Sequence, residues 1–394
     1  MNRWVMLGLL LAFLVLPSIT FSVNALPQTI VVPDDYATIQ SAIDAAQDGA
    51  VIHVKSGVYH ENLKVNKSIS IIGESYDSTV IDGNASEGYR APIRITSNNV
   101  TVTGFTISDS WTGISISQVS GCNISGNRLT NNHEGIVLSD ASRNNLKGNI
   151  IDHVKTNGYG IQLWHASTNN NLERNQITSA SIGIAIRDQF ISPTSIISSQ
   201  NNRLIGNTLE DCKEYAIMLT FTNDNMIIGN NISGSGTGVS LFESDNNKVY
   251  HNNFIGNTRQ VGGNLEPILS GGNGTRYSIC QWDNGKEGNY WSDYNGADAD
   301  NDGIGDTPYV INEANSDNLP LMNPVATQEI NSDEANADFP SPTPSVTTPV
   351  SSSPTPTTTP PTVEPLPVGQ IIAVSASAAV AAIGFFVFFR KSKR

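Results

Sequence analysis

The chain has little cysteine and little positive charge. Its 394 residues include only three cysteines; Cys122 and Cys212 lie several repeats apart, and Cys280 follows the repeats. This spacing indicates no disulfide framework, so we expect mostly buried thiols. Lysine and arginine number 22 against 36 acidic residues, and the net charge is −14. Nucleic acids and anionic lipids bind clustered cations, so we expect no nucleic-acid partner.

Charge is also missing from one long apolar segment near each end of the chain. Residues 4–16 form an unbroken apolar run behind Arg3, which predicts a signal peptide over residues 1–25. Residues 368–389 are uncharged and long enough to cross a bilayer, and residues 390–394 form a basic tail. The sequence therefore predicts a single-pass membrane protein at the cell surface, with its body outside and its C-terminus in the cytoplasm.

The segment before the predicted membrane helix is rich in proline, threonine and serine. We expect residues 326–367 to form a stalk, because the composition from Phe339 onward cannot bury enough apolar surface to fold. Sequons for N-glycosylation agree with an exported glycoprotein. The candidate acceptors are Asn66, Asn84, Asn99, Asn123, Asn231 and Asn273.

Short strands recur through the body of the chain, in two tracks. One track reads Gly-Asn or a close variant, at Asn127, Asn149, Asn175, Asn207, Asn230 and Asn252. The other is an alternating apolar strand that begins at Gly113, Gly135, Gly160, Gly183, Ala216 and Gly238. Units this short bury nothing alone, so they must stack with parallel pairing. The predicted fold class is all-β, a right-handed parallel β-helix or solenoid.

Asparagine suits the turns of such a coil. Its amide can bond the backbone and the asparagine of the next coil, and it tolerates left-handed conformations. A leucine-rich horseshoe would need a Leu-rich consensus with a helical segment in each repeat, and a propeller would need longer blades.

The body divides into three predicted parts. Residues 26–97 hold an N-terminal cap and the first coils, residues 98–257 the Asn-rich coils, and residues 258–325 a C-terminal cap. Apolar residues at helical spacing in residues 38–46 predict a short helix over the first coil.

Several segments of the body match known β-helix proteins. Residues 31–40, 57–62 and 67–73 look like the opening of the pectin-lyase-like proteins. The Asn-rich coils, together with residues 288–294 and 302–309, are more similar to the NosD family, over about residues 29–324. The resemblance implies a β-helix, but it does not imply one activity, because the fold hosts lyases, hydrolases, epimerases, adhesins and non-enzymatic surface proteins.

The resemblance to NosD also implies an exported accessory factor for copper delivery to nitrous oxide reductase. Copper takes clustered His, Met or Cys ligands. We do not expect copper here, because no Met-rich stretch occurs and the histidines are scattered, at His53, His60, His133, His153, His165 and His251. The paired aspartates of polygalacturonases and the Asp-Phe-Ile-Phe-Gly strand of pectin methylesterases are absent as well.

Alignment of the coils places two columns of side chains after the second strand. One column holds Ser139, Trp164, Arg187, Thr220 and Phe242, and the next holds Asp140, His165, Asp188, Phe221 and Glu243. Such a face suits a sugar: aromatic rings as platforms, arginine for a uronate carboxylate, and carboxylate or imidazole for proton transfer. The candidate catalytic residues are Asp140, His165, Arg187, Asp188 and Glu243, and the candidate platforms are Trp164, Phe221 and Phe242. The alternative interpretation is a polar outer face with incidental aromatics.

An acidic loop lies in the predicted C-terminal cap. Its Asp-x-Asp-x-Asp-Gly spacing resembles a calcium loop, although Tyr309 occupies the place of the usual bidentate glutamate. We predict a structural Ca²⁺ that stiffens the cap, held by Asp298, Asp300, Asp302 and Asp306.

Three functions remain open from the sequence. The first is a non-catalytic surface module that binds glycans or packs in an envelope layer. The second is a polysaccharide-active enzyme that uses the face from Asp140 to Glu243. The third is a copper accessory factor, which rests on the family resemblance alone.

Overall fold

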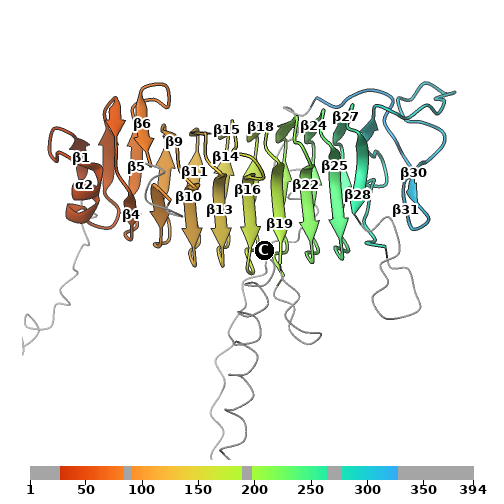
Figure 1. Cartoon of the computed structure of the whole chain (residues 1–394). Coiled ribbons are helices and arrows are strands. Elements are labelled where there is room, and N and C mark those ends of the chain that lie inside the picture. Colours follow the sequence, from red (N-terminus) through yellow and green to blue (C-terminus); the bar gives the residue numbers. More distant parts are fainter. Residues whose placement is uncertain (1–26, 84–90, 189–197, 264–276, 327–394) are drawn as a thin grey trace, which may run out of the picture. The chain divides into compact units, whose positions relative to one another are not determined.

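The body of the chain coils through three parallel β-sheets. The computed structural model describes residues 27–83, 91–188, 198–263 and 277–326. Within them the sheets contain 10, 9 and 10 strands, which we call sheets A, C and B, and the coil makes about ten turns (Figure 1). The predicted all-β parallel solenoid is confirmed, while its right-handed sense stays a prediction.

Sheet A lies along one side of the coil. Its strands are, in order, β1 (Thr29–Val32), β2 (Val51–Val54), β5 (Ser70–Gly73), β8 (Thr101–Thr103), β11 (Asn123–Ser125), β14 (Asn145–Lys147), β17 (Asn171–Glu173), β20 (Arg203–Ile205), β23 (Met226–Ile228) and β26 (Lys248–Tyr250).

Sheet B begins with β3 (Gly57–Tyr59), β6 (Thr79–Asp82), β9 (Thr106–Ser108), β12 (Arg128–Thr130) and β15 (Ile150–Asp152). It continues with β18 (Gln176–Thr178), β21 (Thr208–Glu210), β24 (Asn231–Ser233), β27 (Asn253–Ile255) and β29 (Tyr290–Trp291).

Sheet C contains the longest strands. In chain order they are β4 (Leu63–Val65), β7 (Ile93–Ile95), β10 (Thr112–Ser117), β13 (Glu134–Ser139), β16 (Tyr159–Trp164), β19 (Ile182–Arg187), β22 (Tyr215–Thr220), β25 (Thr237–Phe242) and β28 (Arg259–Gly263).

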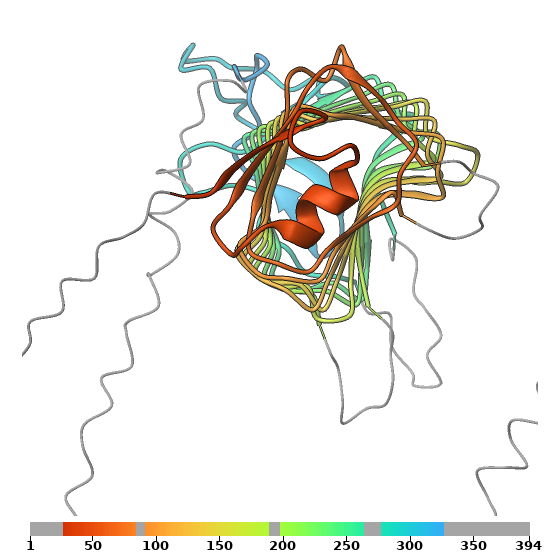
Figure 2. The same cartoon turned by 90° about the vertical axis from the view of Figure 1, so that its left-hand side faces the viewer.

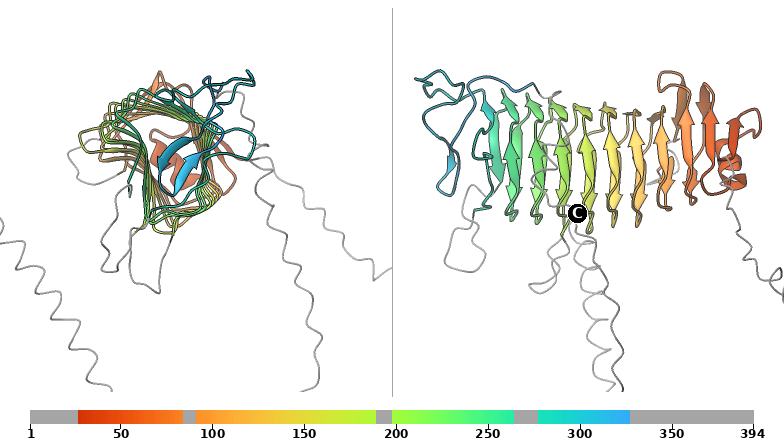
Figure 3. Two further views of the ribbon diagram at one scale, coloured as in Figure 1. Left: turned by 90° about the vertical axis from the view of Figure 1, so that its right-hand side faces the viewer. Right: turned by 180° about the vertical axis from the view of Figure 1, so that it is seen from behind.

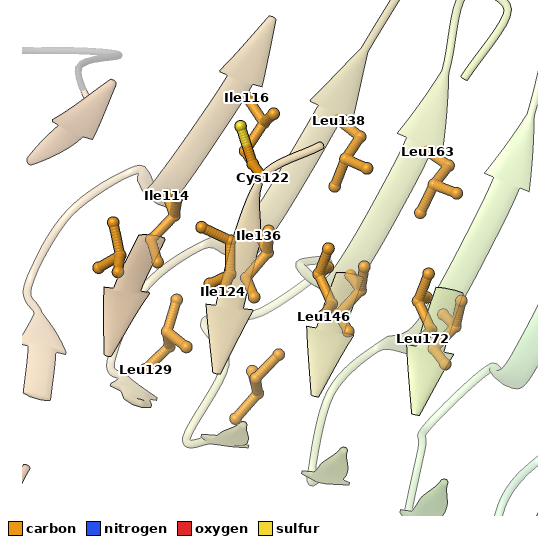
Figure 4. Packing of buried hydrophobic residues seen from close by; sticks show 14 of the residues in the cluster. Ile114, Ile116, Cys122, Ile124, Leu129, Ile136, Leu138, Leu146, Leu163 and Leu172 are labelled. Atoms are coloured by element: carbon orange, nitrogen blue, oxygen red, sulfur yellow. The ribbon is translucent and has the colours of Figure 1, made fainter. Parts of the chain in front are cut away.

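Alternate strand residues fill the interior of the coil. Figure 4 shows Ile114, Ile116, Leu138 and Leu163 from sheet C pointing toward Leu146 and its neighbours from sheet A. Because every coil supplies the same inward positions, the apolar side chains stack in rows and form one continuous core.

Glycine recurs at the second position of the sheet C strands because the coils approach each other closely there. A Cβ at Gly160 would lie 2.6 Å from the carbonyl oxygen of Gly183 on the next coil and 2.6 Å from Ile177 Cγ2. A larger residue there would force adjacent coils apart.

Two columns of buried asparagines run along the coil. The column between sheets A and B contains Asn127, Asn149, Asn175, Asn207, Asn230, Asn252 and Asn289, and the column between sheets C and A contains Asn144, Asn170, Asn202, Asn225 and Asn247. The predicted bonding between asparagines of successive coils is confirmed. After the first asparagine of each column, each side-chain oxygen accepts hydrogen bonds from the backbone N–H and the amide of the asparagine on the previous rung, as Asn175 does from Asn149. The column therefore supplies hydrogen-bond partners to buried backbone N–H groups that water cannot reach.

In the first column, the left-handed conformation is taken by the residue before each asparagine from Asn127 to Asn252. Gly148 and Gly206 have φ of 61°, and Arg174 has φ of 51°. Asn149, Asn207 and Asn175 follow these residues and are not left-handed. The expectation that the asparagine itself takes that conformation is therefore wrong for this column, because its side chain must point into the coil to reach the next rung.

The predicted N-terminal cap is confirmed. Helix α2 (Ile39–Ala45) begins after Thr38, whose hydroxyl accepts from the backbone N–H of Ser41 at 3.1 Å. The Glu61 carboxylate accepts from the first two helical N–H groups at 2.9 Å each. The helix lies across the open end of the first coil, where Ile39 and Ile43 are fully buried (Figure 2).

The opposite end of the coil is closed by the residues that follow the last long strands. Strands β30 (Tyr309–Asn312) and β31 (Asn315–Asp317) form an antiparallel hairpin across that end (Figure 3). Trp291 of β29 stacks between Phe254 and Tyr309, with ring centroids 4.3 Å from each. An apolar stack therefore covers the last coil.

The predicted signal peptide, membrane helix and basic tail lie outside the described residues, as does the predicted stalk apart from Ala326. Among the described residues, no helix has the length and apolar character that crossing a membrane requires.

Candidate functional site

The outer face of sheet C carries the first predicted column. The strand register pairs Ser139 with Trp164, Arg187 with Thr220, and Thr220 with Phe242. All five side chains of that column are therefore on one face, one residue per coil, with rungs about 4.8 Å apart.

Arg187 is the centre of a compact cluster on this face. Its guanidinium carbon lies 5.2 Å from the ring centroid of Tyr159 and 5.5 Å from that of Trp164. With its amide turned to face the guanidinium, Gln162 accepts hydrogen bonds from Arg187 at 2.7 and 2.5 Å. Tyr159, Trp164 and Arg187 are half-buried, and Gln162 is buried beneath them. We call these four residues the Arg187 cluster.

The cluster places a cation beside two half-buried aromatic rings. None of the described carboxylates forms an ion pair with Arg187, and the two rings and Gln162 hold its planar fork in place. A preorganised guanidinium donates paired hydrogen bonds to a carboxylate, and the rings pack against the C–H faces of a sugar.

His165 and Asp140 lie at the edge of the cluster and are exposed. The imidazole stacks on Trp164 with centroids 4.5 Å apart, and its Nδ1 lies 3.4 Å from the Ser139 hydroxyl. Both residues are left-handed, with φ of 49° and 53°, and the Asp140 N–H donates to the His165 carbonyl at 2.9 Å. These two candidates therefore occupy adjacent rungs, as the alignment predicted.

Asp188 differs from its column neighbours because its carboxylate turns inward. It is 7% exposed, and it accepts hydrogen bonds from the backbone N–H groups of Ser199 and Ala166. Burial raises the pKa of Asp188, and the hydrogen bonds from Ser199 oppose that shift. The carboxylate thus holds two turns together and does not face solvent beside Asp140 and His165.

The aromatic candidates at the far end of the face contact each other. Phe221 and Phe242 meet edge to face, with centroids 5.3 Å apart. Glu243 follows Phe242 in a left-handed conformation, with φ of 48°. This pair lies at least one rung beyond Arg187 and forms a separate apolar patch.

One group of acidic side chains among the described residues is close enough together to hold a metal ion. Carboxylate oxygens of Asp298, Asp300 and Asp302 lie within 4.8 Å of one another, and the group is largely exposed. Asp306 was predicted as a fourth ligand, but its carboxylate accepts from the Ala299 N–H at 2.8 Å and does not belong to this group.

The donors that copper prefers are not assembled here. All six histidines and all three cysteines lie in the described residues, and no three of them come together with metal-binding spacing. The cysteines are free, and burial raises the pKa of Cys212 to about 12, which disfavours the thiolate that binds soft metals. In the part of the chain that the structure describes, the histidines and cysteines therefore form no group of three that could hold copper.

The predicted sequons differ in accessibility. Asn66 and Asn99 are exposed, whereas Asn123 and Asn231 are half-buried in strands. Asn84 and Asn273 lie outside the described residues.

A family model agrees with this architecture. The model described as periplasmic copper-binding protein (NosD) matches residues 40–195 and 192–296. These ranges cover the coils that follow β1, together with part of the C-terminal cap.

Two curated proteins are similar in sequence. A cell surface glycoprotein of Methanothermus fervidus is 28% identical over 75% of this chain, and a probable ABC transporter binding protein NosD of Pseudomonas aeruginosa is 36% identical over 27% of it. The chain spans 56% of the first protein's length and 23% of the second's.

Solved structures with a similar chain course include two carbohydrate-active enzymes. The A-module of a mannuronan C-5 epimerase of Azotobacter vinelandii has a TM-score of 0.43 at 15% identity, covering 68% of this chain and 84% of that one. The catalytic domain of an α-1,3-glucanase in complex with tetrasaccharides has a TM-score of 0.49 at 12% identity, covering 68% of this chain and 61% of that one.

Proposed function

This chain belongs to the NosD family of β-helix proteins, and from that premise we propose that it is a non-catalytic cell-surface module that binds glycans through the outer face of sheet C. The observation that carries the proposal is the Arg187 cluster, in which Tyr159, Trp164 and Gln162 hold a cation without a carboxylate partner among the described residues. The similarity to an archaeal cell surface glycoprotein over three-quarters of the chain supports the location.

Binding accounts for this face better than catalysis does. Proton transfer to a sugar needs a carboxylate or imidazole that reaches the substrate. Asp188 is buried against backbone N–H groups, and His165 lies flat on Trp164, which leaves Asp140 as the exposed carboxylate at the edge of the cluster. The aromatic and cationic groups, in contrast, are already arranged as a binding surface. A polysaccharide-active enzyme remains the second candidate, and it would release cleaved or unsaturated saccharide products.

Replacing Trp164 with Ala or Arg187 with Gln is expected to weaken binding to the saccharide that the wild-type chain prefers by about tenfold or more, because each change removes contacts worth at least ~1.4 kcal/mol. The full chain is titrated with a panel of uronate and neutral oligosaccharides by calorimetry, and reaction mixtures are analysed for cleaved or unsaturated products.

Arg128→Gln is the matched control, because Arg128 lies on sheet B and pairs with Asp152 at 2.9 Å. It should bind as the wild type does. If Trp164→Ala and Arg187→Gln bind every saccharide as tightly as this control, the proposed site is wrong. Products that disappear in either variant would favour the enzyme instead.

We also propose that Ca²⁺ binds Asp298, Asp300 and Asp302 and stiffens the C-terminal cap. Three carboxylates this close repel one another, and a hard cation with oxygen ligands would remove that repulsion. Chelation with EGTA is therefore expected to lower the melting temperature by several degrees, because a ligand at 100 times its Kd contributes about 2.7 kcal/mol.

The measurement is a thermal melt of the full chain with Ca²⁺, with Mg²⁺ and with EGTA. Asp300→Asn should reduce the Ca²⁺-dependent shift, whereas Asp109→Asn, a change on a half-buried aspartate in the early coils, should leave it intact. Equal melting temperatures with Ca²⁺ and EGTA would exclude the site.

A further inference from the structure

A second polar site lies on sheet C, several coils before the Arg187 cluster. It is a pocket of about 400 Å³ at the N-terminal end of the sheet. Its lining residues come from β4, β7, β10 and the segments before them: Asn62, Leu63, Lys64, Ala91, Arg94, Thr112 and Ser115.

Two cations stand on adjacent rungs of this pocket. Lys64 of β4 pairs in register with Arg94 of β7, so their Cα atoms are about one strand spacing apart, ~4.8 Å. Both residues are exposed, between inward-facing neighbours such as Leu63 and Ile93 that are 1% exposed. Like charges this close repel each other. An anion bound between Lys64 and Arg94 would be attracted to both side chains and would offset this repulsion.

The surroundings make this pair unusual. The chain has a net charge of −14, yet no carboxylate among the described residues forms an ion pair with Lys64 or Arg94. None of the lining residues given above is acidic. Glu134, one rung past Thr112, accepts a hydrogen bond from the Thr112 hydroxyl at 2.7 Å. Glu134 therefore limits the positive region to the first two rungs.

The pocket is in line with the Arg187 cluster. Register places Lys64, Arg94, Ser115, Val137 and Gln162 in one outward column. Gln162 is the cluster residue that bonds Arg187, and it stands three rungs, ~14 Å, beyond Arg94. A single sugar cannot reach both sites, whereas an extended oligosaccharide parallel to the coil axis can.

We propose that the Lys64–Arg94 pocket binds the carboxylate or sulfate groups of an anionic polysaccharide whose chain continues along sheet C to the Arg187 cluster. The inference rests on the proposed glycan-binding function and names its ligand class. Lys64 and Arg94 supply charge-assisted hydrogen bonds to the anionic group, and Asn62 and Ser115 supply neutral partners for sugar hydroxyls.

The test compares matched ligands that differ in charge. Oligogalacturonates and their methyl esters share one backbone, and sulfated and unsulfated dextran oligomers share another. The full chain is titrated with each, at low and at high salt. The double variant Lys64→Gln with Arg94→Gln is compared with the charge-matched double variant Arg128→Gln with Lys147→Gln, which lies on sheets B and A.

The wild-type chain is expected to bind one of the two anionic ligands at least about tenfold more tightly than its neutral partner, and added salt should reduce that preference. The pocket variant should lose the preference and retain the affinity for the neutral ligand, whereas the control variant should behave as the wild type. Whether the carboxylated or the sulfated oligomer is preferred identifies the anionic group.

The remaining outcomes separate this inference from the proposed function. Neutral and anionic ligands that bind equally, with no effect of the pocket variant, would overturn the pocket and leave the glycan-binding module in place. Anionic binding that depends on Lys64 and Arg94 but is unchanged by Trp164→Ala would retain the pocket and overturn the Arg187 cluster. No saccharide binding by the wild type would overturn both.

Discussion

Replacing Asn207 with Ala is expected to lower the free energy of unfolding by about 3–5 kcal/mol, because each buried polar group left without a partner costs about 1–3 kcal/mol. Asn207 is fully buried. Its Oδ1 accepts from the N–H and the Nδ2 of Asn175 at 2.9 and 3.0 Å, and its Nδ2 donates to the Leu172 carbonyl at 2.8 Å and to Asn230 Oδ1 at 3.0 Å. Alanine would leave the Asn175 N–H and one N–H of the Asn175 amide without their acceptor, and it would leave a cavity.

The comparison variant is Asn231→Ala. Asn231 is half-buried on the outer face of β24, so its loss should change the free energy of unfolding by less than about 1 kcal/mol. Urea denaturation of both variants, followed by circular dichroism, measures the difference. Equal midpoints would mean that the asparagine column does not stabilise the coil.

The repeat made the fold predictable because one structural unit recurs with the same few constraints. Asparagine bridges adjacent coils, and glycine, replaced by alanine at Ala216, stands where strands of sheet C approach closely, so both leave a visible period in the sequence. The conformation of the turn was harder to assign. Both residues of the Gly-Asn pattern tolerate positive φ. The glycine adopts it, because the asparagine side chain must point into the coil to bond the asparagine of the next rung.

Within the candidate site, the sequence predicted only the residues that occupy a position repeated in every coil. Trp164 and Arg187 were placed on one face by register, but Tyr159 and Gln162 were missed because they occur in a single coil and leave no period. The inward turn of Asp188 also escaped prediction, since it depends on how Ser199 returns to the coil after a longer connection. Lys64 and Arg94 lie in early coils that lack the Gly-Asn marks, so alignment of the later coils did not reach them.

The end of the asparagine column explains how the C-terminal cap attaches. Asn289 is the last amide, and the next acceptor is the carboxylate of Asp317, which is fully buried. Its Oδ2 accepts from the Asn289 N–H at 2.7 Å and from Trp291 Nε1 at 2.8 Å, and its Oδ1 accepts from the Leu319 N–H at 3.1 Å. Gly288 is required beside it, since a Cβ there would overlap Asp317 Oδ1.

Asp317→Ala is accordingly expected to destabilise the chain by about 3–5 kcal/mol, because the N–H groups of Asn289 and Trp291 would be buried without an acceptor. Asp317→Asn should cost much less, about 1–2 kcal/mol, because one oxygen still accepts from Asn289 and Trp291 while the amide nitrogen faces the Leu319 N–H. Urea denaturation measures the order of stability, and the fluorescence of Trp291, which stacks on Phe254 and Tyr309, reports on the cap itself. If both variants unfold at the same urea concentration as the wild-type chain, the cap is held by the aromatic stack alone and the carboxylate is dispensable.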